Sequence, residues 1–198
     1  MKKKKIKKAL KDTLVVVSGI PRSGTSLMMQ MLKAGGLDVL SDHQREPDEN
    51  NPKGYLELTA VKSLDKDNSC LKGETGKAVK VISHLLKYVP EDQDYKVIFV
   101  NRNMSEILRS QEKMIGKEEN RLSKVLIKAF TKELKEVKEW AKERPNIEVL
   151  NVNYRKIIEK PSKQIQKIID FLGIPLDKEK MERMIDPSLY RNRIVNED

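Results

Sequence analysis

Short, largely apolar runs alternate with amphipathic stretches along most of the chain. The runs at residues 13–18, 77–83, 95–100 and 147–152 are typical of buried strands in a parallel sheet. The stretches between them repeat apolar residues at helical intervals, which predicts helices packed against the sheet. This alternation predicts a three-layer α/β fold of the P-loop type, with a central parallel sheet flanked by helices.

Helical spacing is clearest over residues 26–36, 105–115 and 119–142. Residues 55–67 also carry this spacing and predict a further helix. The long helix at 119–142 would either pack along the sheet or, through its charged outer face, form a homodimer.

Length and composition favour one domain over residues 13–198, because no repeat or low-complexity linker divides the 198-residue chain. The net charge of +10 favours an anionic ligand. Much of that excess lies in residues 1–12, which we interpret as a solvated basic tail. Aromatic residues make up only 5% of the chain, which argues against a nucleic acid partner because few rings are available to stack on bases.

The chain has no apolar run long enough to span a membrane, and the run after the basic start is too short for a secretory signal. Its single cysteine, Cys70, rules out an internal disulfide and fits a reducing compartment. These features predict a cytoplasmic protein.

The segment SGIPRSGTS follows the first predicted strand and precedes a helix, at the edge of the sheet where ligands of parallel α/β proteins bind. Gly19 and Gly24 have the spacing of a loop that wraps backbone N–H groups around an anion. Thr25 replaces the lysine of nucleotide triphosphatases, and Arg22 brings a positive charge into the loop. Asn101 follows a later strand, where a magnesium-organising acid would be needed. The loop therefore favours an anion held without a metal.

Together with a second motif, this loop resembles that of the sulfotransferases, which use 3′-phosphoadenosine 5′-phosphosulfate (PAPS). GIPRSGTS is similar to the family's 5′-phosphosulfate loop. In VIFVNRNMSEILRSQEKM, Arg102 and Ser110 have the spacing of the pair that binds the donor's 3′-phosphate. Residues 149–175 resemble the family's strand, tyrosine turn and closing helix. The resemblance runs from about Val15 to Pro175 and is nearest to small bacterial sulfotransferase-like proteins.

The resemblance implies transfer of a sulfuryl group from PAPS to a hydroxyl or amine of a small-molecule or carbohydrate acceptor, with no metal. Arg22 would act as a catalytic cation, and basic residues near the C-terminus would close over the donor. For Arg102, a salt bridge with Glu106 is the alternative role. The residues expected to bind the donor are Arg22, Ser23, Gly24, Thr25, Ser26, Arg102, Ser110, Arg191 and Arg193.

The general base that deprotonates the acceptor has several candidates. Glu57 ranks first because it lies in the first turn of the helix predicted at 55–67, although a carboxylate there also stabilises the helix dipole. His84 ranks second, because it ends a predicted strand where hydroxyl-acting members of the family carry Lys-x-His. Its spacing from Lys80 departs from that register. Glu46, in the middle of a loop, ranks third.

Two other functions stay open from the sequence. A P-loop kinase for a small metabolite would need magnesium ligands, and the loop hydroxyls are the only ones the sequence offers. A non-catalytic protein that binds adenosine bisphosphate would keep both phosphate motifs and lack the base.

Overall fold

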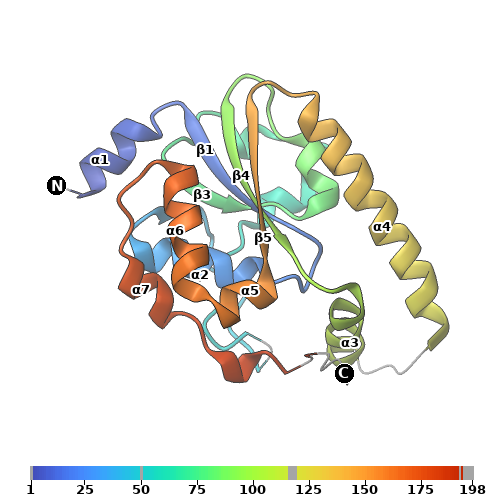
Figure 1. Cartoon of the computed structure of the whole chain (residues 1–198). Coiled ribbons are helices and arrows are strands. Elements are labelled where there is room, and N and C mark those ends of the chain that lie inside the picture. Colours follow the sequence, from blue (N-terminus) through green and yellow to red (C-terminus); the bar gives the residue numbers. More distant parts are fainter. Residues whose placement is uncertain (1, 50, 116–119, 192, 194–198) are drawn as a thin grey trace.

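A five-stranded sheet runs through the middle of the molecule, with helices on both of its faces (Figure 1). The strand order is β2-β3-β1-β4-β5, and all neighbouring strands are parallel. This arrangement confirms the predicted three-layer α/β fold with a parallel sheet. The computed structural model describes residues 2–49, 51–115, 120–191 and 193.

The elements follow one another in a strand–helix alternation. The strands are β1 (Thr13–Ser18), β2 (Asp38–Val39), β3 (Lys77–Lys80), β4 (Asp94–Asn101) and β5 (Ile147–Asn153). The α-helices are α1 (Lys2–Ala9), α2 (Thr25–Gly35), α3 (Met104–Ile115), α4 (Asn120–Lys142), α5 (Tyr154–Glu159), α6 (Pro161–Leu172) and α7 (Lys178–Arg183). Short 3-10 helices are η1 (Thr59–Ser63), η2 (Ser69–Leu71), η3 (Ser83–Tyr88) and η4 (Pro187–Leu189).

The central strand β1 supplies apolar side chains to two cores, because successive residues of a strand point to opposite faces. Val15 and Val17 pack in the core beneath α2, α5, α6 and α7. Leu14 and Val16 pack in the other core, which the 3-10 helices η1, η2 and η3 and the C-terminal half of α4 cover. Burial on both faces fixes the register of β1 and therefore the position of the loop that follows Ser18.

The N-terminal segment differs from the expected solvated tail. Residues Lys2–Ala9 form helix α1, in which Ile6 is buried, and Leu10 just beyond it is also buried. Both side chains belong to the core on the α2 side of the sheet. The segment is amphipathic: Lys3, Lys4, Lys5, Lys7 and Lys8 are exposed, while the two apolar side chains anchor it.

The prediction of a helix at residues 55–67 is wrong. The chain is irregular up to Leu58, and only the short 3-10 helix η1 follows. Spacing of three residues between apolar positions fits a 3-10 turn as well as an α-helix, which explains the error. Glu57 therefore lies in an irregular segment ahead of η1, where no helix dipole stabilises its charge.

Candidate functional site

The loop between β1 and α2 requires glycine at two positions. Gly19 has φ 151° and Gly24 has φ 106°, values that other residues rarely adopt. A Cβ atom on Gly19 would lie 2.6 Å from the carbonyl oxygen of Val100, and one on Gly24 would lie 2.2 Å from the Tyr154 ring. Backbone conformation and crowding thus both explain the glycine spacing seen in the sequence.

The N-terminus of α2 is arranged to receive an anion. Gly24 is its N-cap residue and has no side chain, so it gives no side-chain capping bond to the first N–H groups of the helix. The hydroxyl of Ser23 is buried and has no hydrogen-bond partner among the described residues. An anion at this end would accept hydrogen bonds from the first N–H groups of the helix and interact favourably with the helix dipole.

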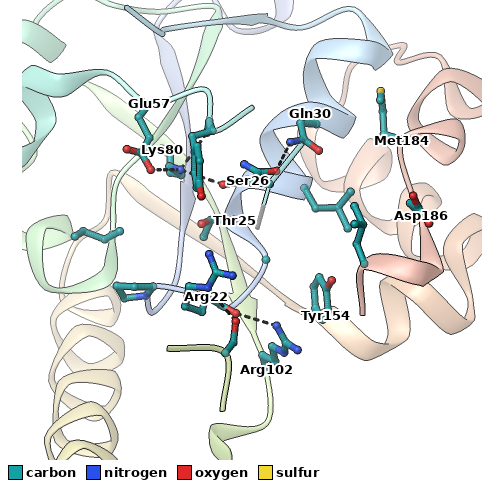
Figure 2. Close-up of a pocket in the computed structure, with 18 of the residues that line it drawn as sticks. Arg22, Thr25, Ser26, Gln30, Glu57, Lys80, Arg102, Tyr154, Met184 and Asp186 are labelled. Carbon is teal, nitrogen blue, oxygen red and sulfur yellow. Dashed lines mark hydrogen bonds and ion pairs between the residues drawn. The ribbon is translucent and has the colours of Figure 1, made fainter. Parts of the chain in front are cut away.

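A cavity of about 220 Å³ opens in front of this loop (Figure 2). Its walls come from the loop, the carboxyl ends of β3 and β4, the segment around Tyr55 and the residues after α7. Positive charge predominates among the described lining residues. The charged residues in its lining are the cations Arg22, Arg45, Lys80, Arg102 and Arg191 and the carboxylates Glu57 and Asp186.

The two predicted phosphate motifs meet in this cavity. The Nε of Arg22 donates a hydrogen bond to Ser110 Oγ at 2.9 Å. Nη1 of Arg102 donates to the carbonyl oxygen of Arg22 at 3.1 Å (Figure 2). Arg22 itself has φ 74°, a strained value for a residue with a side chain. The loop between β1 and α2 is therefore hydrogen-bonded directly to the end of β4 and to α3, which carry the second motif.

Arg102 also makes the salt bridge with Glu106 that was the alternative role predicted from the sequence. Its Nε lies 3.0 Å from Glu106 Oε2, and both side chains are buried. The guanidinium lies over the rings of Tyr154 and Tyr190, at 4.7 Å and 5.2 Å from their centroids. We call Arg102, Glu106, Tyr154 and Tyr190 the Arg102 cluster. Because Arg102 lines the cavity as well, the salt bridge and a binding role are compatible.

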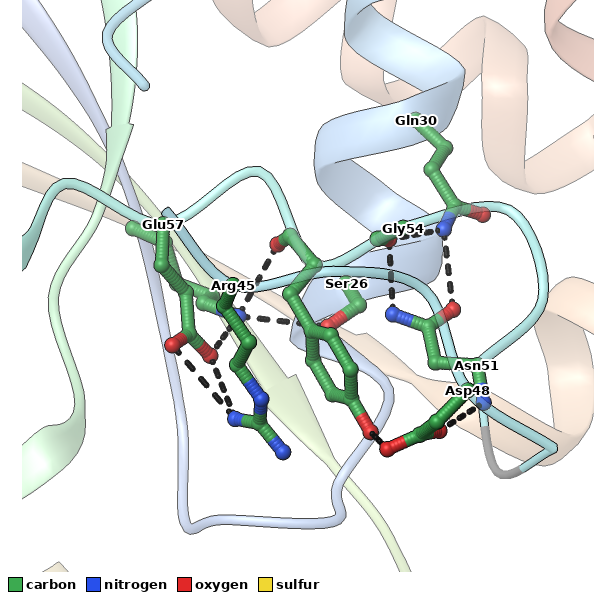
Figure 3. Close-up of polar contacts among 9 residues, drawn as sticks. Ser26, Gln30, Arg45, Asp48, Asn51, Gly54 and Glu57 are labelled. Carbon is green, nitrogen blue, oxygen red and sulfur yellow. Dashed lines mark hydrogen bonds and ion pairs between the residues drawn. The ribbon is translucent and has the colours of Figure 1, made fainter. Parts of the chain in front are cut away.

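Glu57 lines the opposite side of the cavity, between two cations (Figure 3). Its Oε1 lies 2.7 Å from Lys80 Nζ and 3.1 Å from Arg45 Nη1. Burial raises the pKa of Glu57, but the hydrogen bonds and charges of Lys80 and Arg45 outweigh this and hold the pKa below its usual value. Burial lowers the pKa of Lys80, an effect that Glu57 partly offsets. Glu57 is therefore a carboxylate at neutral pH.

Lys80 connects this ion pair to the anion-binding loop. Besides Glu57, its Nζ donates to Ser26 Oγ at 3.2 Å and to the carbonyl oxygen of Tyr55 at 3.0 Å. Ser26 belongs to the first turn of α2, so one buried ammonium fixes the loop, β3 and the segment that carries Tyr55. Arg45 lies 3.4 Å above the Tyr55 ring and covers it.

The loop before Glu57 is tied to α2 by a set of amide contacts (Figure 3). Gln30 Nε2 donates to Asn51 Oδ1 at 3.0 Å and to the carbonyl oxygen of Gly54 at 2.6 Å. Asn51 Nδ2 donates to the same carbonyl. The Tyr55 hydroxyl donates to Asp48 Oδ2 at 2.7 Å. These contacts order the wall of the cavity opposite the Arg102 cluster.

The other two base candidates lie outside this cavity. His84 is exposed on the 3-10 helix η3, because β3 ends at Lys80 and the chain turns before the imidazole. The prediction that His84 ends a strand is therefore wrong. Glu46 is exposed and lines a neighbouring hollow together with Pro47 and Lys53. Of the three carboxylate and imidazole candidates, Glu57 is the one that faces the cavity.

Most of the residues expected to bind the donor are brought together. Those that line the cavity are Arg22, Gly24, Thr25, Ser26, Arg102, Ser110 and Arg191. Ser23 lies buried behind the loop surface. Arg193 is not part of the lining and forms an ion pair with Glu159 at 3.0 Å.

Lys80 and Arg45 are residues of the cavity to which sequence reasoning gave no role. A signal for Lys80 was present, because a lysine inside an apolar strand run needs a buried partner. Arg45 carried no such signal, since a charged residue in a polar loop is ordinarily solvated.

Comparison with known proteins now gives the family. The model of the sulfotransferase domain family matches residues 12–194, so the chain belongs to the sulfotransferase family. Family membership supports a sulfotransferase activity. Among curated protein sequences, none gives a significant match.

Solved structures with the same fold include a bacterial and a mammalian sulfotransferase. The sulfotransferase domain of the Synechococcus PCC 7002 olefin synthase is 15% identical, with a TM-score of 0.54, over 94% of this chain and 90% of that one. Mouse sulfotransferase SULT7A1, complexed with PAP (adenosine 3′,5′-bisphosphate), is 16% identical, with a TM-score of 0.54, over 93% of this chain and 68% of that one. At these identities the likeness concerns the fold alone. In the described part of the chain, no helix is both long and apolar enough to cross a membrane.

Proposed function

We propose that the chain transfers a sulfuryl group from PAPS to a hydroxyl or amine of a small-molecule or carbohydrate acceptor. The observation that carries the proposal is the junction of the two phosphate motifs, where Arg22 bonds Ser110 and Arg102 bonds the Arg22 backbone. A nucleotide with anionic groups on both the 5′ and the 3′ positions of its ribose would present one group to each motif. The N-terminus of α2, where the N-cap glycine offers no side-chain cap, supports the same ligand.

Each part of the proposed donor site has a separate task. Arg22 and the loop amides would bind the phosphosulfate, and the hydroxyls of Thr25 and Ser26 would add hydrogen bonds. Arg102 and Ser110 would bind the 3′-phosphate, with the guanidinium fork giving charge-assisted contacts. PAPS supplies the activated sulfuryl group. Positive charge placed in advance around the leaving phosphate stabilises the transition state.

Glu57 is the proposed base, acting on the proton of the acceptor. Because its pKa is held below the usual value, it is ionised throughout the neutral range, and turnover should be flat from about pH 6 upward. Glu57→Gln should lower turnover about 100-fold or more with little change in donor binding. His84→Ala serves as the control, because that imidazole lies outside the cavity, and it should keep most of the turnover.

Calorimetry with adenosine 3′,5′-bisphosphate (PAP), the desulfated donor, tests the donor assignment. Binding should persist in EDTA, whereas ATP with magnesium and single-stranded DNA should bind much more weakly. Loss of binding on metal removal would instead support a P-loop kinase. Binding of PAP without any turnover of PAPS, over a panel of phenols, amines and sugars, would instead support a non-catalytic nucleotide-binding protein.

A further inference from the structure

The segment after α7 places an aromatic side chain inside the molecule. Tyr190 follows the 3-10 helix η4 and is only 8% exposed. Its ring meets the Tyr154 ring edge to face, with centroids 5.2 Å apart and an interplanar angle of 88°. Its hydroxyl lies 2.7 Å and 2.8 Å from the two carboxylate oxygens of Glu106. This part of the C-terminal segment is therefore docked.

The docked ring and hydroxyl determine what Arg102 can do. The guanidinium lies over both tyrosine rings, which fix its plane. Its Nε bonds Glu106 and its Nη1 bonds the carbonyl oxygen of Arg22. A guanidinium has five N–H groups, which is more than these two bonds use. The remaining donor capacity is available to a ligand in the cavity, which Arg102 lines.

We propose that Tyr190 is a positioning residue for recognition of the donor's 3′-phosphate, acting through Glu106 on Arg102. The inference rests on the proposed function, since it assumes that Arg102 binds that phosphate. The Tyr190 hydroxyl engages both oxygens of Glu106, so Arg102 shares this carboxylate with the tyrosine. Without the hydroxyl, the guanidinium would be drawn fully into the fork geometry that arginine and carboxylate prefer. Its N–H groups would then turn away from the cavity.

The same arrangement couples donor recognition to the end of the chain. Arg191, next to Tyr190, lines the cavity. Docking of Tyr190 therefore delivers a further cation to the ligand and orients Arg102 in a single step. Glu106 is buried, so the hydroxyl also compensates part of the cost of keeping this carboxylate away from water.

Removal of the hydroxyl alone tests this role. Tyr190→Phe keeps the ring and its packing, so the fold should be retained. Calorimetry should compare PAP with adenosine 5′-monophosphate, which lacks the 3′-phosphate. We expect Tyr190→Phe to weaken PAP binding roughly tenfold and to change binding of the monophosphate by less than about twofold, because only the 3′-phosphate depends on Arg102. The matched control is Tyr88→Phe on the exposed Tyr88, which should bind both nucleotides like the wild type.

Each result has a defined meaning. Unchanged binding of both nucleotides, or equal weakening of both, would overturn the positioning role, since a structural defect does not distinguish the two ligands. Failure of the wild-type protein to bind PAP would overturn the proposed function itself, and this is seen before any variant is measured. If Tyr190→Phe does not fold, Glu106→Gln provides the second test. An amide cannot draw the guanidinium into the fork, so PAP should bind within about twofold of the wild type or more tightly, and a loss of PAP binding would overturn the positioning role.

Discussion

The ion pair of Lys80 and Glu57 should make a measurable contribution to folding that a double-mutant cycle can isolate. Lys80 Nζ lies 2.7 Å from Glu57 Oε1, and the two side chains are 6% and 17% exposed. At that distance and an effective dielectric constant of about 20, the Coulomb attraction is worth about 6 kcal/mol. The cost of taking Lys80 out of water offsets most of it, and Arg45 gives Glu57 a second partner. We therefore expect a net coupling of about 1–2 kcal/mol.

The perturbations are Glu57→Gln, which keeps the shape, and Lys80→Met, which keeps most of the length of the side chain without its charge. We expect the free energy of unfolding to fall by about 1–3 kcal/mol for the first and by about 2–4 kcal/mol for the second. Lys80→Met costs more because it also leaves Ser26 Oγ and the Tyr55 carbonyl without this donor. The assay is urea unfolding of the wild type, both single variants and the double variant, and the coupling is the departure from additivity.

An exposed pair on α4 provides the control for this cycle. Lys135 and Glu139 are separated by 3.9 Å and their side chains are 76% and 59% exposed. The corresponding Lys135→Met and Glu139→Gln variants should show no measurable coupling, because solvent and salt screen exposed pairs. A coupling for Lys80 and Glu57 as small as that of the control would refute the reasoning that burial strengthens this pair.

Three further predictions concern the site. Arg102→Ala should weaken the binding of PAP by about 2–4 kcal/mol and should weaken the binding of adenosine 5′-monophosphate far less. Equal losses for both nucleotides in calorimetry would show that Arg102 has a structural role. Gly24→Ala should lower the melting temperature, because its Cβ would lie 2.2 Å from the Tyr154 ring at φ 106°, and an unchanged melting curve would contradict this. Because folding lowers the pKa of Glu57, its carboxylate stabilises the fold at pH values above the usual pKa of 4.5. This stability is lost as the pH falls through the lower, folded-state pKa. Urea unfolding at acid pH should therefore show a shallower decline for Glu57→Gln than for the wild type, and equal slopes would show that Glu57 is not the group concerned.

The sheet and the anion-binding end of the cavity could be predicted because each has a strong local signal. The runs at 13–18 and 95–100 are nearly uninterrupted in apolar character, as strands buried on both faces require, and they end within a residue of β1 and β4. Glycine spacing and a basic residue after a strand end are likewise local. The residues that follow such strands meet at one edge of a parallel sheet, which is why Arg22 and Arg102 could be paired in advance.

The rest of the site depends on contacts between segments far apart in sequence. The burial of Ile6 among lysines and the docking of Tyr190 onto Glu106 arise only when other elements cover them. The turn that takes His84 out of the cavity depends on where β3 stops pairing with β1. A single apolar residue among charges, or a histidine near a strand end, carries too little local information to fix its orientation.

The Arg102 cluster also has a consequence for the order in which the molecule is made. The hydrogen bonds that join Arg22, Arg102, Glu106, Ser110 and Tyr190 close loops of 80, 84 and 88 residues. Contacts of such long range, like the pairing of β1 with β4 itself, form only when the entropy of closing the loop is offset. During synthesis on the ribosome, the sheet gains all its strands once β5 has emerged, but Tyr190 follows roughly forty residues later by the numbering of β5 and η4. A nascent chain that already holds its parallel sheet would therefore still lack a finished nucleotide site until the segment that carries Tyr190 has emerged.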